Sequence, residues 1–208
     1  MYIPAYFHNK DNDDVKDFIH ANGFAILVSE VNGRPWATHI PMILDKSADN
    51  RDILTGHISK ANRQWKDFKS NREVLAIFNG PNAYISSSWY DHENVPTWNY
   101  IAVHVYGKIR ITRGDILKEH MSKLVDRYES GMEKPVSVSG MSEGYLEKEL
   151  KGIVGFEIEI SDIQAVKKLS QNRDEYNKDR IISELERRGD AGSLEIAALM
   201  RKGKSTNP

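Results

Sequence analysis

The chain has 208 residues, with 29 Lys and Arg against 30 Asp and Glu and a formal net charge of -1 at pH 7. That balance excludes a chain-wide positive field that would attract nucleic acid. The chain contains no cysteine, which excludes disulfides, thiolate metal sites and a cysteine nucleophile. The opening residues MYIPAYFHNKDNDD lack a basic stretch followed by an apolar run, and no apolar segment reaches roughly 18 residues. We therefore expect a cytoplasmic protein with neither a signal peptide nor a membrane-spanning helix.

The first half of the chain predicts one helix followed by several strands. Asp11 or Asn12 is a suitable cap for a helix over 13–21. Asn32-Gly33 is a strong hairpin signal between strands 24–31 and 34–44. Further strands are predicted at 52–58, 73–78 and 83–88, with a short helix over 61–69 and a turn at 79–82.

Residues 99–112 show the clearest alternation in the second half. Ile101, Val103 and Val105 share one face with Gly107, and a mid-strand glycine predicts a bend or a close backbone approach. The remaining predicted elements are helices 115–130 and 142–150, a loop 132–140, strands 154–160 and 165–169, helices 173–188 and 193–202, and a frayed end at 202–208.

About seven or eight strands with short connections predict a mainly β, antiparallel barrel with peripheral helices. We expect residues 1–170 to form this barrel domain. Residues 171–208 are predicted to be a helical C-terminal appendage within the same structural unit.

Residues 79–108 mix aromatic and small polar side chains in an unusual way. Trp89, Trp98 and Tyr100 lie among serines, Thr97 and Asn99. Aromatic faces with a few hydroxyl and amide groups are typical of a site for a planar polar ligand. A hairpin whose aromatic side chains only pack together explains the same composition equally well.

Three shorter segments carry candidate binding chemistry, each with a structural alternative. HISKAN, residues 57–62, offers Ser59 and Lys60 to a phosphate, or a helix cap beside a solvated lysine. THIP, residues 38–41, offers His39 to a ligand or to the core. KLSQNR, residues 168–173, can hydrogen-bond a ligand or cap the helix that follows.

Several function classes lack their motifs. The seven histidines show no H-x-x-x-H or H-x-H spacing, so we predict no metal site. No G-x-S-x-G, G-x-G-x-x-G or Walker A sequence is present, and we assign no catalytic residue. The last two predicted helices could form a helix-turn-helix, but Leu194, Ile196 and Leu199 favour packing or a dimer contact over a DNA-reading surface.

Seven segments together resemble one family. They are, in order, MYIPAYF, ATHIPMIL, LTGHISKANRQW, AIFNGPNAYISSSWY, VPTWNYIAVHVYGKI, IVGFEIEI and KLSQNR. The same order is seen in PaiB-type proteins, described as FMN-binding negative transcriptional regulators, and the resemblance covers residues 1–200. It implies a six-stranded antiparallel split barrel and a homodimer with FMN at the subunit interface.

The resemblance also implies a set of cofactor-binding residues. It places Ser59, Lys60 and Asn62 near the FMN phosphate. It places Thr38, His39 and Ile40 along the flavin edge, with Trp98, Asn99 and Tyr100 closing the ring. His57 and the late residues Gln171, Asn172 and Arg173 complete the set.

The family's role is repression of sporulation and degradative-enzyme genes. Because the net charge is near zero, we expect weak nonspecific DNA binding and an indirect route of regulation. An FMN-dependent oxidoreductase resembling flavin reductases is the alternative, since the cofactor would supply the chemistry. A haem-binding barrel using His39 or His57 is the third possibility, so the sequence leaves open whether the chain is an enzyme.

Overall fold

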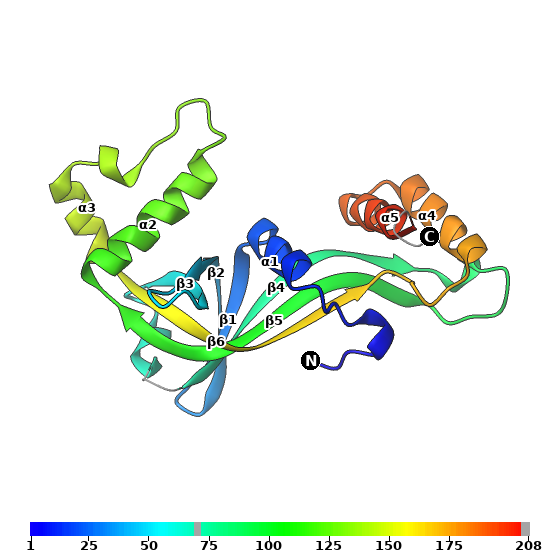
Figure 1. Cartoon of the computed structure of the whole chain (residues 1–208), viewed down its shortest axis with the longest axis horizontal. Coiled ribbons are helices and arrows are strands. Elements are labelled where there is room, and N and C mark those ends of the chain that lie inside the picture. The colour runs from blue at the N-terminus through cyan, green and yellow to red at the C-terminus, as the bar shows by residue number, and fades with distance from the viewer. Residues whose placement is uncertain (69–71, 205–208) are drawn as a thin grey trace. The chain divides into compact units, whose positions relative to one another are not determined.

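The computed structural model describes residues 1–68 and 72–204 (Figure 1). It contains six strands in this range: β1 (Phe24–Val31), β2 (Arg34–Lys46), β3 (Asp52–Ser59), β4 (Glu73–Ile85), β5 (Thr97–Thr112) and β6 (Ile153–Lys168). The α-helices are α1 (Asn12–Ala21), α2 (Gly114–Glu129), α3 (Glu143–Leu150), α4 (Glu175–Arg188) and α5 (Ala191–Lys204). Short 3-10 helices are η1 (Ala5–Phe7), η2 (Arg63–Asp67), η3 (Ser87–Trp89) and η4 (Val138–Gly140).

The strands form a closed barrel in the order β1-β2-β3-β6-β5-β4. The β1–β2 hairpin turns at Asn32 and Gly33, whose φ angles are 51° and 77°, and Val31 pairs with Arg34. A two-residue turn with both φ angles positive matches the twist of the flanking strands. This confirms the hairpin, and the six strands agree with the number that the family resemblance implies.

The predicted turn at 79–82 is wrong, because β4 runs through it without a break. A Cβ on Gly80 would lie 2.5 Å from a ring carbon of Phe18, which belongs to α1. The glycine therefore allows a close packing contact within a strand, although in the sequence it resembles turn punctuation.

The predicted break at 161–164 is also wrong, since β6 continues from Ile153 to Lys168. Ser161 and Asp162 lie on the strand with exposed side chains, and the Ser161 hydroxyl donates to Glu73 at 3.3 Å. Two pairs of predicted strands thus merge into two long strands, β4 and β6. For this reason the expected number of strands, seven or eight, was wrong.

The chain divides into two compact units, each built from separate segments. One contains Met1–Phe18, Asn79–His104 and Gln164–Pro208, and is called unit 1 below. The other, unit 2, contains Ile19–Phe78 and Val105–Ile163. None of the boundaries between these segments falls at residue 170, and the expected barrel domain over 1–170 with an appendage stays a prediction.

Unit 1 has a core in which α4 and α5 are fully integrated. Its buried residues are Ala83, Ile85, Tyr90, Leu169, Ile181, Ile182, Leu185, Ile196, Ala197 and Met200. Gly189 ends α4 in the left-handed conformation at φ 74°, as helix C-termini commonly do. The two predicted C-terminal helices are confirmed. Of the frayed end predicted at 202–208, residues 202–204 continue α5, and residues 205–208 lie outside the described part of the chain.

Unit 2 is built around buried side chains from all its strands. Gly56 of β3 pairs with Phe156 of β6, and a Cβ on Gly56 would lie 2.5 Å from the phenylalanine ring. Phe68 meets that ring edge-on at a centroid distance of 5.7 Å. This packing anchors the segment that leaves β3, where several candidate binding residues lie.

No helix of the described residues is long and apolar enough to cross a membrane.

Candidate functional site

The segment after β3 is fixed by an asparagine cap. The side chain of Asn62 accepts a hydrogen bond from the Gln64 backbone N–H at 3.0 Å, which begins η2. Its amide Nδ2 donates to Thr38 Oγ1 at 2.9 Å. Two predicted site residues, from the THIP and HISKAN segments, are therefore in direct contact. The predicted helix is shorter than expected, and its last residue, Lys69, lies outside the described residues.

Gln64 holds this arrangement from inside unit 2. Its side chain is fully buried, and Thr38 Oγ1 donates to Gln64 Oε1 at 2.5 Å. Gln64 Nε2 donates to the Leu27 carbonyl at 3.2 Å and to Ser29 Oγ at 3.0 Å. A buried amide that satisfies both its oxygen and its nitrogen rigidifies the groups around it. Sequence reasoning missed Gln64, because a glutamine inside a polar helix carries no signal of burial.

Strands β2 and β3 separate beside this network. Their pairing runs from Met42 with Gly56 to Lys46 with Asp52, and among the described residues it does not extend to Thr38–Ile40. On its other side this part of β2 stays paired with β1, Ala25 lying opposite Ile40. The separation leaves one backbone edge of residues 38–40 next to the end of β3, and this edge is where the resemblance expects the flavin.

The three predicted β2 residues differ in exposure. Ile40 is buried, Thr38 is half-buried and His39 is exposed. The His39 ring stacks on the exposed ring of Phe24 at a centroid distance of 6.2 Å and an interplanar angle of 29°. Two neighbouring exposed rings offer aromatic surface of the type that planar ligands pack against.

Ser59 and Lys60 offer hydrogen-bond donors at the end of β3. Both side chains are exposed. The Ser59 hydroxyl accepts from the Ala61 N–H at 3.3 Å, which leaves its own hydrogen available. Within the described residues no carboxylate pairs with the Lys60 ammonium, whereas its backbone N–H is held by the Gly152 carbonyl at 2.8 Å. A fixed backbone that carries an unpaired cation and a hydroxyl suits a phosphate.

His57 faces a different neighbour. Its Nδ1 lies 3.3 Å from His120 Nε2, and His120 Nδ1 lies 3.1 Å from Thr55 Oγ1. Burial lowers the pKa of His57. Burial, with a smaller contribution from His57, lowers the pKa of His120 to about 4. Both rings are therefore neutral at pH 7, and the cofactor role of His57 stays a prediction.

The remaining predicted residues belong to unit 1. Asn99 is fully buried, exchanges hydrogen bonds with Ser170 Oγ at 3.0 and 3.1 Å, and approaches Met200 Sδ at 3.6 Å. Its amide thus holds β5, the segment after β6 and α5 together. Trp98 and Tyr100 line a hollow of about 380 Å³ with Asn79, Gly80, Asn82 and Ile101.

The QNR residues begin the connection to α4. Gln171 Oε1 accepts from the Leu169 N–H at 2.7 Å, and its Nε2 donates to the Lys167 carbonyl. Asn172 is exposed. Arg173 lies over the Tyr90 ring at 5.2 Å and donates to Asn94 Oδ1 at 3.4 Å. Gln171 is occupied in shaping the turn, and a role of these residues toward a flavin stays a prediction.

Residues 1–162 match a family model described as "Putative FMN-binding domain". A Bacillus subtilis (strain 168) protein named "Protease synthase and sporulation protein PAI 2" is 44% identical over 200 residues, covering 96% of each chain. The chain belongs to the PaiB-type family. An uncharacterized protein of Emericella nidulans is 30% identical over 244 residues, covering 97% of each chain.

Solved structures extend the comparison of this PaiB-type chain to its fold. The flavocytochrome Anf3 of Azotobacter vinelandii superposes with a TM-score of 0.60 at 16% identity, covering 85% of this chain and 77% of that one. The FAD and heme binding protein of Mycobacterium smegmatis gives 0.60 at 13% identity, with coverages of 82% and 78%. These neighbours confirm the expected antiparallel split barrel, and at such identities the likeness is one of fold.

No group of three or more potential metal ligands occurs in the described part of the PaiB-type chain.

Proposed function

We propose that this PaiB-type chain binds FMN where β2 and β3 separate, and that it acts as a negative regulator of sporulation and degradative-enzyme genes. The observation that carries the FMN proposal is the exposed Lys60 ammonium, which has no carboxylate partner among the described residues and directly follows Ser59, whose exposed hydroxyl keeps its own hydrogen available. A phosphate dianion meets an ammonium and a hydroxyl through charge-assisted hydrogen bonds. The donor set therefore fits the phosphate end of FMN.

The neighbouring residues would hold the rest of the cofactor. The backbone edge of Thr38–Ile40 would hydrogen-bond the polar edge of the flavin, and the His39 and Phe24 rings would cover an apolar face. The Asn62 and Gln64 amides would not need to move, because they already fix Thr38. When bound, FMN supplies one- and two-electron chemistry, while the protein binds and orients it.

The regulatory part of the proposal rests on the family. The name of the Bacillus subtilis relative connects that protein with protease synthesis and sporulation. A net charge of -1 gives little attraction to the DNA phosphate backbone, so we propose that regulation proceeds through a partner or a ligand in place of direct DNA reading. We also propose a homodimer in the cytoplasm, as in the family resemblance.

FMN titration of the purified flavin-free protein tests the cofactor proposal. We expect saturable quenching of FMN fluorescence with one flavin per chain. Lys60→Ala should weaken binding by about ten- to a hundredfold, because a hydrogen bond to a charged group contributes about 1.5–3 kcal/mol.

Lys66→Ala is the matched control, since Lys66 is also an exposed lysine on the same short segment, within η2. Its affinity for FMN should stay within about twofold of the parent value, a change below 0.5 kcal/mol. Equal losses in both variants would indicate a general charge effect and would reject the site at Lys60. Absence of saturable binding by the parent protein would reject FMN, whereas FMN-dependent oxidation of NADH would favour the oxidoreductase alternative.

A further inference from the structure

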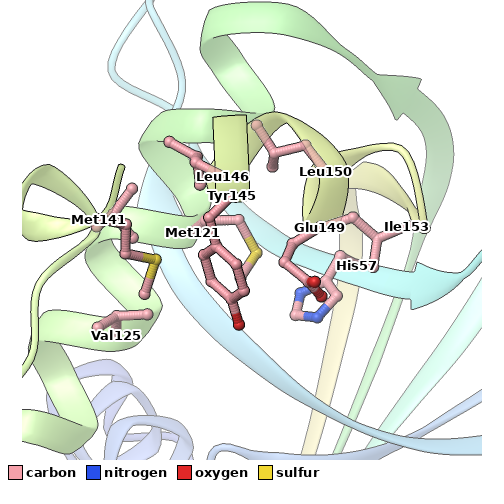
Figure 2. Close-up of a pocket in the computed structure, with 10 residues that line it drawn as sticks. His57, Met121, Val125, Met141, Tyr145, Leu146, Glu149, Leu150 and Ile153 are labelled. Atoms are coloured by element: carbon pink, nitrogen blue, oxygen red, sulfur yellow. The ribbon is translucent and has the colours of Figure 1, made fainter. Parts of the chain in front are cut away.

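Unit 2 contains a pocket outside the β2–β3 opening. It has a volume of about 280 Å³ and is lined by β3, α2, η4, α3 and the start of β6 (Figure 2). In the view of Figure 2, His57 and Ile153 lie at one end and Met141 and Val125 at the other. This volume lies just below the roughly 300–1,000 Å³ of typical ligand sites, so it suits a small molecule.

The pocket walls are mostly apolar and incompletely covered. The apolar lining includes four half-buried side chains, those of Met121, Val125, Leu146 and Ile153. Covering such side chains removes apolar surface from water, at roughly 25 cal/mol per Å². Methionine is flexible and polarizable, so Met121 and Met141 can adapt to ligands of different shape. The walls therefore favour an apolar ligand body.

His57 supplies a directional polar group in this lining. Its Nδ1 is bonded to His120, and its Nε2 makes no hydrogen bond with any described residue. His57, His120 and Thr55 form a chain of hydrogen bonds between neutral groups. The hydrogens in this chain can all point toward His57 or all point toward Thr55, depending on the histidine tautomers. In one direction His57 Nε2 carries the hydrogen and donates, and in the other it accepts. The imidazole can therefore match a hydroxyl group, which also donates or accepts.

Besides His57 and the Tyr145 phenol, the pocket lining contains one further titratable group, Glu149. Its carboxylate disfavours a carboxylate or phosphate on the ligand, because like charges repel. The neutral His57 ring gives no compensating positive charge. An anionic head group is thus a poor fit for this lining.

We propose that this pocket binds a small neutral molecule with an apolar body about the size of one aromatic ring and a hydroxyl group that hydrogen-bonds His57. Such a site would allow the protein to respond to an apolar effector. The proposal does not depend on FMN, and it is tested on the flavin-free full chain so that the two proposals fail separately.

Methionine-methyl NMR gives a direct readout, with 4-ethylphenol as the probe. Met121 and Met141 line the pocket, while Met42 is fully buried elsewhere in unit 2 and serves as the internal control. We expect saturable shifts of the Met121 and Met141 signals with the Met42 signal unmoved. Single Met→Leu variants assign the signals. Absence of saturable shifts, or equal shifts at all three methionines, would overturn the pocket.

Two variants test the body and the head separately. Leu146→Trp fills the pocket from the half-buried face of α3 and should abolish the shifts, with an unchanged Met42 signal reporting an intact barrel. His57→Phe keeps an aromatic ring but removes the polar nitrogen. It should change the affinity ratio of 4-ethylphenol to ethylbenzene by about tenfold in favour of ethylbenzene, the effect of leaving a hydroxyl unpaired. An unchanged ratio would overturn the role of His57, and tighter binding of 4-ethylbenzoate than of 4-ethylphenol would overturn the neutral head group.

Discussion

Gly107 lies where β5 approaches β6 closely. A Cβ added there would lie 2.3 Å from the Glu159 carbonyl oxygen and 2.5 Å from Ile158 Cγ2. Backbone atoms cannot move away as a flexible side chain can, so the contact must be relieved by shifting a strand. This confirms the close backbone approach, one of the two outcomes that a mid-strand glycine predicts.

We expect Gly107→Ala to lower the free energy of unfolding by about 2 kcal/mol or more, the usual effect of overpacking. Urea denaturation measures the change. Gly144→Ala is the matched control, because no atom lies within 4 Å of a Cβ at that position of α3. That change should raise helix propensity and stabilise the protein by about 0.5–1 kcal/mol. A neutral result for Gly107→Ala would show that the strands separate easily there.

The buried imidazole of His120 makes stability depend on pH. Its pKa is lowered from 6.5 to about 4, chiefly by burial. At pH 5 the unfolded chain protonates this histidine while the folded chain leaves it neutral, so acidification favours unfolding. The stabilisation is complete above pH 6.5 and is lost as the pH falls toward 4.

We expect the free energy of unfolding to fall by about 2 kcal/mol between pH 7.5 and pH 5 from His120 alone. Urea denaturation at the two pH values measures the difference. In His120→Gln the absolute stability should be lower but the pH difference should shrink by about 2 kcal/mol, while the lowered pKa values of His57 and His104 contribute to the remainder. An undiminished difference would assign the effect to other groups.

At the residue scale, the structure brings together some of the residues that separate motifs predict. The contact between Thr38 and Asn62 joins the THIP and HISKAN segments, which are distant in sequence. Gln64 and His120 were missed, because their burial depends on packing between elements and no local spacing reports it. Asn99 and Gln171 are predicted to contact the cofactor, and the structure shows their amides bonded within the chain.

At the scale of elements, α5 shows how an amphipathic pattern becomes packing. Ile196 and Ala197 are buried in the core of unit 1, whereas Leu194 is 45% exposed. The Asp190 side chain accepts from the Ser193 N–H at 3.0 Å and caps this helix. The predicted packing role of the last helix is therefore confirmed, while a dimer contact stays a prediction.

Ile196→Ala should destabilise the protein by about 2–4 kcal/mol, through lost transfer energy and a cavity. Leu194→Ala on the same helix should change stability by less than about 1 kcal/mol, since its side chain is already partly in water. Thermal unfolding of both variants compares them. Equal losses would indicate that the exposed leucine has a partner in solution, such as a second copy of the chain.

The two merged strands show where local sequence signals are misleading. Gly80-Pro81 in β4 and Ser161-Asp162 in β6 are residue types typical of turns. In the structure Gly80 accommodates Phe18, and the Ser161 hydroxyl bonds Glu73. Both explanations involve residues distant in sequence, so no local window contains them.

At the scale of the whole molecule, the antiparallel barrel class followed from short connections and alternating patterns, and its six strands followed from the family resemblance. The strand order β1-β2-β3-β6-β5-β4 required coordinates, since it places β3 beside β6 across about 100 residues of sequence. Homodimer formation, which the resemblance also implies, stays a prediction.

The sequence by itself determined the family, the mainly β class, the β1–β2 hairpin and the amphipathic helices. These features are encoded in contiguous motifs or in short periodic patterns. The tertiary structure alone decided that β2 and β3 separate beside Lys60, that Gln64 fixes Thr38, and that His57 turns toward His120 and an apolar pocket. Each of these depends on which distant elements pack together, because burial and pairing are properties of the assembled chain and not of any one segment.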